Sequence, residues 1–444
     1  MGMGGETGEL GRISPGHDRC EMRKESQACG QTLKQSANSV IANCPAGEIG
    51  PAKSTFFYSF VRPILAHQQR RNPMFDPGSI VVTAQSIKTS LDIWKFVRQR
   101  AKSLVASRSD RFLDYNPGNL ANQYSGERTV APGIAYVLDC DLLDLHNKHQ
   151  SSSDPPPDLV RLESQRRRFE LSSGNGAWKM TATAGFEALR VSGRVSANEP
   201  LIRVRSTEVK ADTLVMNVQL SQYHDQARSN LILDFDRENP GTHVSLRSQL
   251  CAKYDGCLPD LSDGRLANTL GVAMLIYYRS NGTWIPYLVR RVKKIGVFPG
   301  GVHCSASGAA KWPARSQTVS FADVTDHLLD EAKEELGLLP ADLSDFRPVS
   351  YCREMARGGK PQLFYCALTT LSRKELAERR KHAARVAREL KLWEEIERDR
   401  WYRSADVVMS ASRLRHGLAA WGVTLEGAAS LYFGSKYLRI LSRQ

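Results

Sequence analysis

The sequence predicts an α/β protein of the α+β class, and three observations support this. Two apolar runs at 270–278 and 284–289 flank Asn281-Gly282, a dipeptide typical of β-hairpin turns. A helical pattern of apolar residues follows at about 320–336. A further apolar run, Leu363 to Leu368, comes soon afterwards. Strands and helices therefore share one stretch of chain.

The helix expected at about 320–336 has defined ends. Ser320, followed three residues later by Asp323, predicts a capping box at its start. Gly337, followed by Pro340, predicts its end. An apolar stripe along this helix predicts that one side is buried. The stripe consists of Val324, Leu328, Leu329, Ala332 and Leu336.

The same helix carries an acidic flank. Residues three and four apart share a helix face, so we expect Glu331, Glu334 and Glu335 to converge. Mg²⁺ prefers oxygen ligands and is commonly shared between carboxylates and the phosphates of a substrate. The alternative is an acidic helix face that is merely solvated.

The order of these elements resembles the Nudix hydrolase superfamily. A hairpin leads into a strand and glycine loop, Val297-Phe-Pro-Gly-Gly-Val302, and then into an E-x-x-E-E-x-G helix. The family signature pairs a glycine loop with R-E-U-x-E-E-x-G-U, where U is bulky and apolar, and Ala332 takes the first U position. The signature positions that match are Glu331, Glu334, Glu335, Gly337 and Leu338.

The chain also departs from this signature. Asp330 stands where the family has an arginine, and Ser307 stands where a glutamate follows the loop glycine, Gly301. An insertion at 309–319 separates the loop from the helix. The resemblance covers about residues 268–372, and these departures affect the loop and one outer carboxylate of the signature.

The resemblance implies a fold, a reaction and a set of site residues. The fold is an α/β/α sandwich with a mixed sheet. The reaction is hydrolysis of a diphosphate linkage in a nucleoside diphosphate bonded to another moiety, with Mg²⁺ or Mn²⁺ as cofactor. Glu331, Glu334 and Glu335 would bind the metal, and Glu334 or Glu335 would also accept the proton of the attacking water.

Residues near the loop are candidates for binding an anionic substrate. Backbone at Gly300 and Gly301 can approach phosphates closely, although an ordinary tight turn explains this pair equally well. Basic side chains can bind a diphosphate, or can simply be solvated at a strand end. The basic candidates are Arg290, Arg291, Lys293, Lys294, Arg353 and Lys360.

Cysteine and histidine usage does not predict a zinc site. His303 and Cys304 adjoin the glycine loop, but no C-x-x-C or H-x-x-x-H pattern accompanies them. The nine cysteines are odd in number and scattered, which favours a reducing compartment. No apolar run approaches the length of a membrane span, and residues 1–6 lack a signal pattern, so we expect a cytoplasmic protein.

The formal net charge of +14 favours anionic partners without identifying them. Much of the excess is local, as in the run 373–388, which also carries glutamates and an apolar stripe. That pattern favours a solvated helix over an RNA-binding surface. Nucleic acid stays a weakly supported partner, and no membrane partner is expected.

Six regions are expected along the 444 residues. Before the Nudix-like part we expect a disordered tail, an α-rich region, a linker and a β-rich extension that packs on the Nudix core; after it we expect C-terminal helices. In order these are 1–54, 55–150, 151–159, 160–265, 266–372 and 373–444. Strands within the extension are expected at 178–184, 186–195, 201–209 and 213–220.

Three functions compete at this point. The first is a metal-dependent diphosphate hydrolase, which the glutamates favour. The second is a Nudix-like module that binds or senses a nucleotide without cleaving it, as Asp330 and Ser307 suggest. The third is an RNA-associated protein, supported only by charge. The sequence leaves the substrate and the oligomeric state open.

Overall fold

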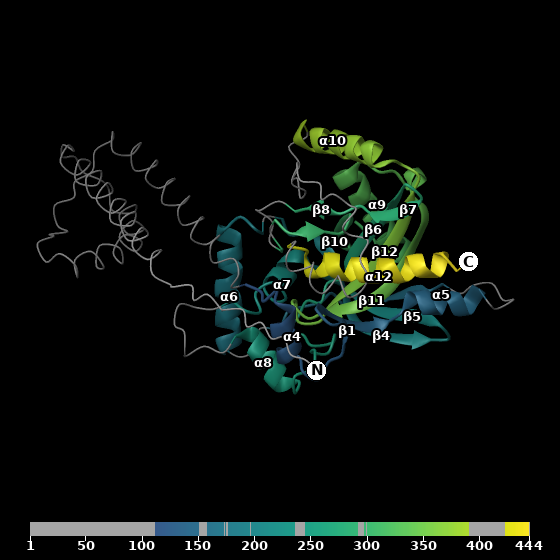
Figure 1. Ribbon diagram of the computed structural model, residues 1–444. Helices are drawn as coiled ribbons and strands as arrows, with labels where there is room; N and C mark the ends of the chain where they lie inside the picture. The colour runs from purple at the N-terminus through teal and green to yellow at the C-terminus, as the bar shows by residue number, and fades with distance from the viewer. Residues whose placement is uncertain are drawn as a thin grey trace, which may run out of the picture. The chain divides into compact units, whose positions relative to one another are not determined.

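The computed structural model is an α+β protein, as the sequence predicts (Figure 1). The residues it describes belong to one compact unit, Lys102–Gln444. They are 112–150, 158–172, 174, 176–195, 197–235, 245–291, 297–298, 300–389 and 422–443. The expected tail, most of the expected α-rich region and nearly all of the expected linker lie outside these ranges.

A seven-stranded mixed sheet forms the centre of the described unit. Its order is β1-β2-β11-β12-β6-β10, and β7 pairs with β6 at the end of a hairpin. β6 and β12 run parallel, and the other pairs are antiparallel. The strands are β1 (Thr129–Ala131), β2 (Ile134–Cys140), β6 (Gly271–Ser280), β7 (Thr283–Pro286), β10 (Ala306–Ala309), β11 (Ser344–Glu354) and β12 (Lys360–Thr369).

The two parallel strands are buried on both faces, which is why they appear in the sequence as almost continuous apolar runs. Alternate side chains point to opposite faces. Met274 and Tyr365 belong to one hydrophobic core cluster, and Leu275 and Phe364 belong to another. The mixed sheet therefore separates two cores.

Helices cover both faces of this sheet, so the expected α/β/α arrangement is present. The helix α9 (Phe321–Leu336) shares the first core and contacts β10 and β6. The helix α12 (Leu425–Leu441) shares the second core and lies across β6, β12, β11 and β2 (Figure 1). The helix α10 (Arg373–Glu389) packs on α9.

The predicted ends of α9 are confirmed. Ser320 Oγ accepts from the backbone N–H of Asp323 at 3.2 Å, and the Asp323 carboxylate accepts from the backbone N–H of Ser320 at 2.7 Å. Gly337 ends the helix in the left-handed conformation, with φ of 70°. The capping box and the glycine stop are both local features, so a short window of sequence is enough to find them.

The hairpin predicted at Asn281-Gly282 is also confirmed, and a second hairpin joins two other strands of the sheet. Asn281 and Gly282 have φ of 48° and 76° between β6 and β7, as a type I′ turn requires. Gly358 and Gly359, with φ of 64° and 85°, turn the chain between β11 and β12. The strand expected at 297–298 is not formed, because Phe298 has a φ of 49° and turns its ring against Tyr115.

A three-stranded sheet packs against the first core. It has the order β3-β5-β4, and its strands are β3 (Val160–Ser164), β4 (Pro200–Lys210) and β5 (Thr213–Gln222). The strands expected at 201–209 and 213–220 are therefore confirmed. The insertion after the glycine loop joins this sheet, since Trp312 N–H donates to Pro200 O at 3.0 Å and Lys311 pairs with Leu201.

The strands expected at 178–184 and 186–195 are wrong. This stretch forms the helix α6 (Gly176–Val191), and its buried residues recur at helical spacing. Thr and aromatic residues suggested strands, but the burial of one helical stripe in a third core decided the structure. That stripe consists of Trp178, Ala182, Gly185, Phe186 and Leu189.

Shorter elements complete the described unit. No helix among the described residues combines the length and the apolar character that crossing a membrane requires. The remaining elements are α4 (Pro117–Gln123), α5 (Leu142–Gln150), α7 (Tyr223–Ala227), α8 (Leu246–Lys253), β8 (Val289–Arg290), β9 (Val302–His303) and the 3-10 turn Pro340–Asp342.

Replacing Gly337 by alanine tests the junction between α9 and α10. A Cβ at this position would lie 2.6 Å from Arg379 O, in addition to the left-handed φ. Gly133→Ala is a matched control, because its φ is 82° and nothing lies within 4 Å of a Cβ there. We expect Gly133→Ala to lower the free energy of unfolding by about 1–2 kcal/mol. In urea unfolding, Gly337→Ala should lower the free energy of unfolding by about 1–3 kcal/mol more than Gly133→Ala does. Equal losses in the two variants would contradict the close packing of α9 against α10.

Candidate functional site

The acidic side of α9 faces the strand β10. Glu331 has a side chain that is 17% exposed and lies against Gly308. A Cβ on Gly308 would lie 3.1 Å from Glu331 Oε1, so the missing side chain lets helix and strand approach closely. The first predicted metal ligand is therefore held at the surface of the sheet.

The other two glutamates extend from the same side of the helix. Glu334 is exposed and Glu335 is half-buried. Glu335 lies close enough to Cys304 to help raise the pKa of its thiol, although burial is the main cause. Burial opposes the charged form of Lys311, but the charge and hydrogen bond of Glu199, together with the charges of Glu331 and Glu334, outweigh it and raise the pKa of that lysine. Glu331 and Glu334 thus act on one lysine, and Glu335 reaches toward the loop that follows the glycine bend.

His327 lies one helical turn before Glu331. Burial, and then the charge of Lys311, lower the pKa of His327 to about 4, so the imidazole is neutral near pH 7. Its Nε2 lies 3.0 Å from Ala309 O and 3.4 Å from Glu331 Oε1. A neutral ring beside a carbonyl must donate from that nitrogen, so Nε2–H points at both oxygens.

These carboxylates suit a hard divalent cation. Glu331, Glu334 and Glu335 offer only oxygen ligands, and they sit on adjacent turns of a rigid helix. Mg²⁺ and Mn²⁺ prefer such ligands, complemented by water and phosphate oxygens. Glu331 fills the space beside Gly308, and the exposure of Glu334 leaves this side of α9 open to a ligand.

The glycine bend lies between β8 and β9. Gly300 has a φ of 71°, and a Cβ on Gly301 would lie 2.6 Å from Thr424 Cγ2. Only glycine lets the start of α12 come so close. Arg290 Nη1 donates to Gly300 O at 2.9 Å, and the backbone N–H of Arg291 donates to Gly301 O at 2.9 Å. Two of the predicted substrate-binding arginines therefore also brace this bend.

The side chains of the other basic candidates, and the guanidinium of Arg291, lie in different places. Arg291 Nη1 lies 3.4 Å from Ser307 Oγ, beside the bend. Arg353 donates to Gly359 O at 3.2 Å and to Pro259 O, at the hairpin between β11 and β12. β11 is three strand spacings, roughly 14 Å, from β10. Lys293 and Lys294 lie outside the described residues.

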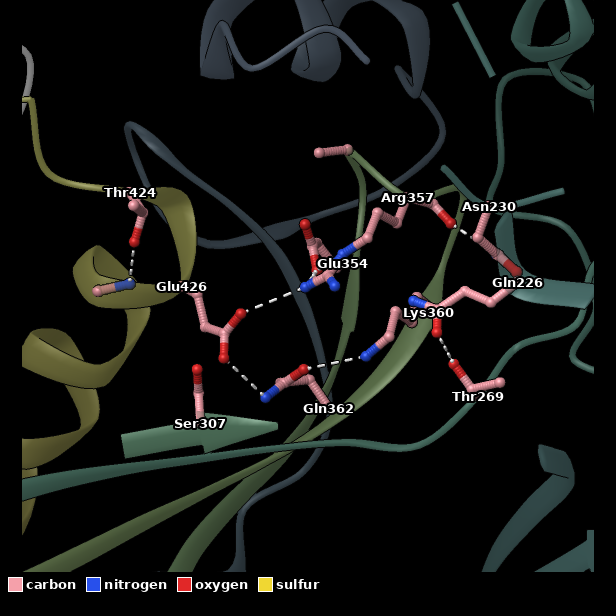
Figure 2. A network of polar contacts seen from close by, with 12 residues as sticks. Gln226, Asn230, Thr269, Ser307, Glu354, Arg357, Lys360, Gln362, Thr424 and Glu426 are labelled. Atoms are coloured by element: carbon pink, nitrogen blue, oxygen red, sulfur yellow. Dashed lines mark hydrogen bonds and ion pairs between the residues drawn. The ribbon is translucent and has the colours of Figure 1, made fainter. Parts of the chain in front are cut away.

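A buried polar network occupies the opposite face of the sheet (Figure 2). Glu426 on α12 accepts from Gln362 Nε2 through Oε1 and from Arg357 Nη2 through Oε2, both at 3.2 Å. Arg357 Nε also donates to Glu354 Oε2 at 2.6 Å, and Lys360 Nζ donates to Gln362 Oε1 at 3.3 Å. Glu354 Oε1 has no hydrogen-bond partner among the described residues.

Burial shapes the charges in this network. It lowers the pKa of Lys360 to about 7, with the neighbouring Arg357 as the next cause, and it raises the pKa of Glu426. Of these residues, Lys360 alone is among the substrate-binding candidates predicted from the sequence. Charged residues at the ends of otherwise apolar strands were the available signal, but the contribution of α12 has no local signal in the sequence.

His303 connects the loop after the bend to α12. Its Nδ1 lies 2.6 Å from Thr424 Oγ1, its Nε2 lies 2.9 Å from Ser307 Oγ, and Nε2 lies 3.7 Å from Glu426 Oε1. Burial, and then the charge of Arg291, hold the pKa of His303 well below its usual value. Ser307, where the family signature has a glutamate, therefore packs between His303 and Arg291.

Acid titration tests the position of His327. The unfolded histidine, with an ordinary pKa of 6.5, takes up a proton before the folded one, whose pKa is about 4. Stability should therefore be complete above pH 6.5 and should fall by roughly 3 kcal/mol as the pH drops toward 4. In urea unfolding across this pH range, the stability of His327→Gln should fall less steeply than that of the unaltered protein, because glutamine keeps an N–H donor but does not titrate. The exposed His382→Gln is the control, and a slope that His327→Gln leaves unchanged would contradict the burial of this ring.

Comparison with known proteins gives only remote likenesses. No protein-family model matches the sequence, and neither does any curated protein. Among solved structures, a C. elegans Ap4A hydrolase in a binary complex is 13% identical, with a TM-score of 0.22 over 38% of this chain and 98% of that one. A mutT/nudix family protein from Listeria innocua is 13% identical, with a TM-score of 0.24 over 39% and 95%. A Deinococcus radiodurans protein is 20% identical, with a TM-score of 0.18 over 23% of this chain and little more than half, 57%, of that one. TM-scores this low carry no argument about fold or activity.

Proposed function

We propose that the protein is a metal-dependent hydrolase that cleaves a diphosphate linkage in a nucleoside diphosphate bonded to another moiety. The observation that carries this proposal is the acidic side of α9. Glu331 packs against Gly308, while Glu334 and Glu335 extend from the same side toward solvent and toward the loop beyond the glycine bend. Carboxylates beside a glycine-rich bend suit a divalent ion and a phosphate-bearing substrate.

In this proposal Glu331, Glu334 and Glu335 hold Mg²⁺ or Mn²⁺. When bound, the ion neutralises phosphate oxygens and makes a coordinated water more acidic. Glu334 is exposed and Glu335 half-buried, so both can reach a water molecule in this region. Either carboxylate accepts the proton of the attacking water. The side chain of Glu331 is only 17% exposed and packs against Gly308, so positioning the ion is its main role.

The residues that would contact the substrate are the glycines and arginines at and near the bend. Gly300 and Gly301 let backbone approach the phosphates, and Arg291 stands beside the bend with its guanidinium near Ser307. Arg290 has one N–H group engaged by Gly300 O, so its first role is to hold the loop. Arg353 is engaged at the far hairpin and would need to be reached by an extended substrate.

Lys311 offers a physical reason why Asp330 is tolerated in place of the family's arginine. Lys311 follows β10 in the insertion, forms an ion pair with Glu199 at 3.4 Å, and is favoured in its charged form by Glu331 and Glu334. It therefore supplies a positive charge on the strand side of the acidic face. Asp330 itself is exposed.

The second candidate function is nucleotide binding without turnover. Asp330 and Ser307 favour it, because both replace charged signature residues, and Ser307 has no carboxylate to offer a metal. The net charge of +14 is the sole support for an RNA-associated role. Binding without cleavage would be the distinguishing result for the second candidate.

The full-length protein should hydrolyse at least one member of a panel of nucleotide sugars, dinucleotides and related diphosphates when Mg²⁺ or Mn²⁺ is present. Glu334→Gln and Glu335→Gln should each lower the rate at least about 100-fold, because each removes a metal ligand or proton acceptor. Removing the metal with a chelator should have the same effect. Phosphate-containing products, separated by ion-exchange chromatography, provide the measurement.

Glu378→Gln is the control for this experiment, since Glu378 is an exposed carboxylate on α10. Its rate should match that of the unaltered protein. Turnover that persists in both Glu334→Gln and Glu335→Gln would exclude the proposed site. Tight binding of a panel member without turnover would instead support the nucleotide-binding function.

A further inference from the structure

Three side chains that suit a softer metal converge behind the glycine bend. His303 is the last residue of β9, Cys304 follows it, and Glu426 comes from the first turn of α12. One donor atom from each residue lies within 4.8 Å of the other two, and all three residues are buried. These are three donors of different chemistry, brought together from two distant parts of the chain.

The imidazole of His303 is oriented as a metal ligand requires. Its Nδ1 is engaged by Thr424 Oγ1 at 2.6 Å, which leaves Nε2 directed toward Glu426 Oε1, 3.7 Å away. Metal-bound histidines usually donate their second ring N–H to an oxygen in this way, which fixes the ring and the tautomer. Ser307 Oγ, 2.9 Å from Nε2, is the group that an ion would displace or recruit.

The carboxylate of Glu426 is held just as firmly. Gln362 donates to Oε1 and Arg357 donates to Oε2, both at 3.2 Å (Figure 2). Figure 2 shows this carboxylate extending from α12 toward the strands, with Ser307 directed at it from β10. The oxygen that faces His303 is therefore positioned by neighbours that do not have to move.

We propose that His303 Nε2, Cys304 Sγ and Glu426 Oε1 bind a zinc ion. A thiolate and an imidazole favour Zn²⁺ over Mg²⁺, which prefers oxygen ligands alone. The charges of one thiolate and one carboxylate cancel those of Zn²⁺. A water molecule or Ser307 Oγ completes the tetrahedron. Glu354 offsets the charge of the nearby Arg357 through their ion pair.

The ligands of this zinc site do not include the carboxylates of α9, and the site does not depend on the proposed hydrolysis. Its ligands join the loop after the glycine bend to the start of α12, where Gly301 and Thr424 are already in close contact. A metal that binds the folded chain raises its stability by mass action. The ion would therefore fix the bend against α12.

Metal content of the full-length protein is the first test. After purification with zinc present and dialysis against a weak chelator, elemental analysis should find about one zinc per chain. Stripping with a strong chelator should lower the Tm, and zinc should restore it where Mg²⁺ does not. A folded protein that retains well under one-tenth of an equivalent, even after reconstitution, would overturn the proposal.

Cobalt substitution identifies the ligands without altering the chain. Co²⁺ at this site should show an intense thiolate-to-metal charge-transfer band in the near ultraviolet, together with the visible absorption of a tetrahedral ion. Zinc should abolish both signals. Co²⁺ bound without the charge-transfer band would place the ion on oxygen and nitrogen ligands only, which would overturn the proposal.

Variants then separate this site from the α9 carboxylates. Cys304→Ser and Glu426→Gln should each weaken zinc binding at least about 10-fold, as loss of a ligand does. Cys366→Ser is the matched control, because Cys366 is buried in the same core and is not one of the three ligands. The double variant Glu334→Gln, Glu335→Gln should keep its zinc. Loss of zinc in that double variant would contradict the assignment, and so would retention of zinc by both Cys304→Ser and Glu426→Gln. If one of these variants does not fold, the cobalt spectrum of the unaltered protein provides the test instead.

Discussion

The parallel pairing of β6 with β12 is the constraint on which the rest of the structure depends. Eight residues of each strand are in register, and both strands are buried on both faces. A sheet of this kind requires a cover on each side, which α9 and α12 supply. Because β10 pairs with the free edge of β6, the carboxylates of α9 come to lie beside β10, and the same edge carries the loop that meets α12. Both proposed metal sites are consequences of that one strand order.

The two sites use opposite physical chemistry. The side chain of Glu331 is 17% exposed and Glu334 is exposed, so water and a charged substrate can reach this side of α9. His303, Cys304 and Glu426 are buried, and the carboxylate of Glu426 forms an ion pair with Arg357. Buried ionisable groups are costly unless they are paired, so the network of Glu354, Arg357, Lys360 and Gln362 has to be satisfied internally. A cation that neutralises a thiolate and a carboxylate reduces that cost.

Local features of the fold were accessible from sequence. The capping box at Ser320, the stop at Gly337 and the Asn281-Gly282 turn all depend on neighbours within a few residues, and the structure confirms them. Residues 176–191 form a helix in place of the two expected strands, because their buried side chains follow a helical period and pack in a third core. The pairing of β2 with β11 and the arrival of Glu426 beside His303 depend on contacts between distant segments. A single sequence does not reveal such contacts, and this is why His303 and Cys304 lacked a visible partner.

The central claim is that the carboxylates of α9 hold a divalent ion beside the glycine bend. Anomalous diffraction from crystals of the full-length protein soaked in Mn²⁺ tests this directly, because it locates the ion without requiring a substrate. We expect a manganese peak at about 2.0–2.3 Å from carboxylate oxygens of Glu331, Glu334 or Glu335, with at least two of these residues as ligands. A fully soaked crystal with no peak on this side of α9, or with manganese bound only elsewhere, would contradict it.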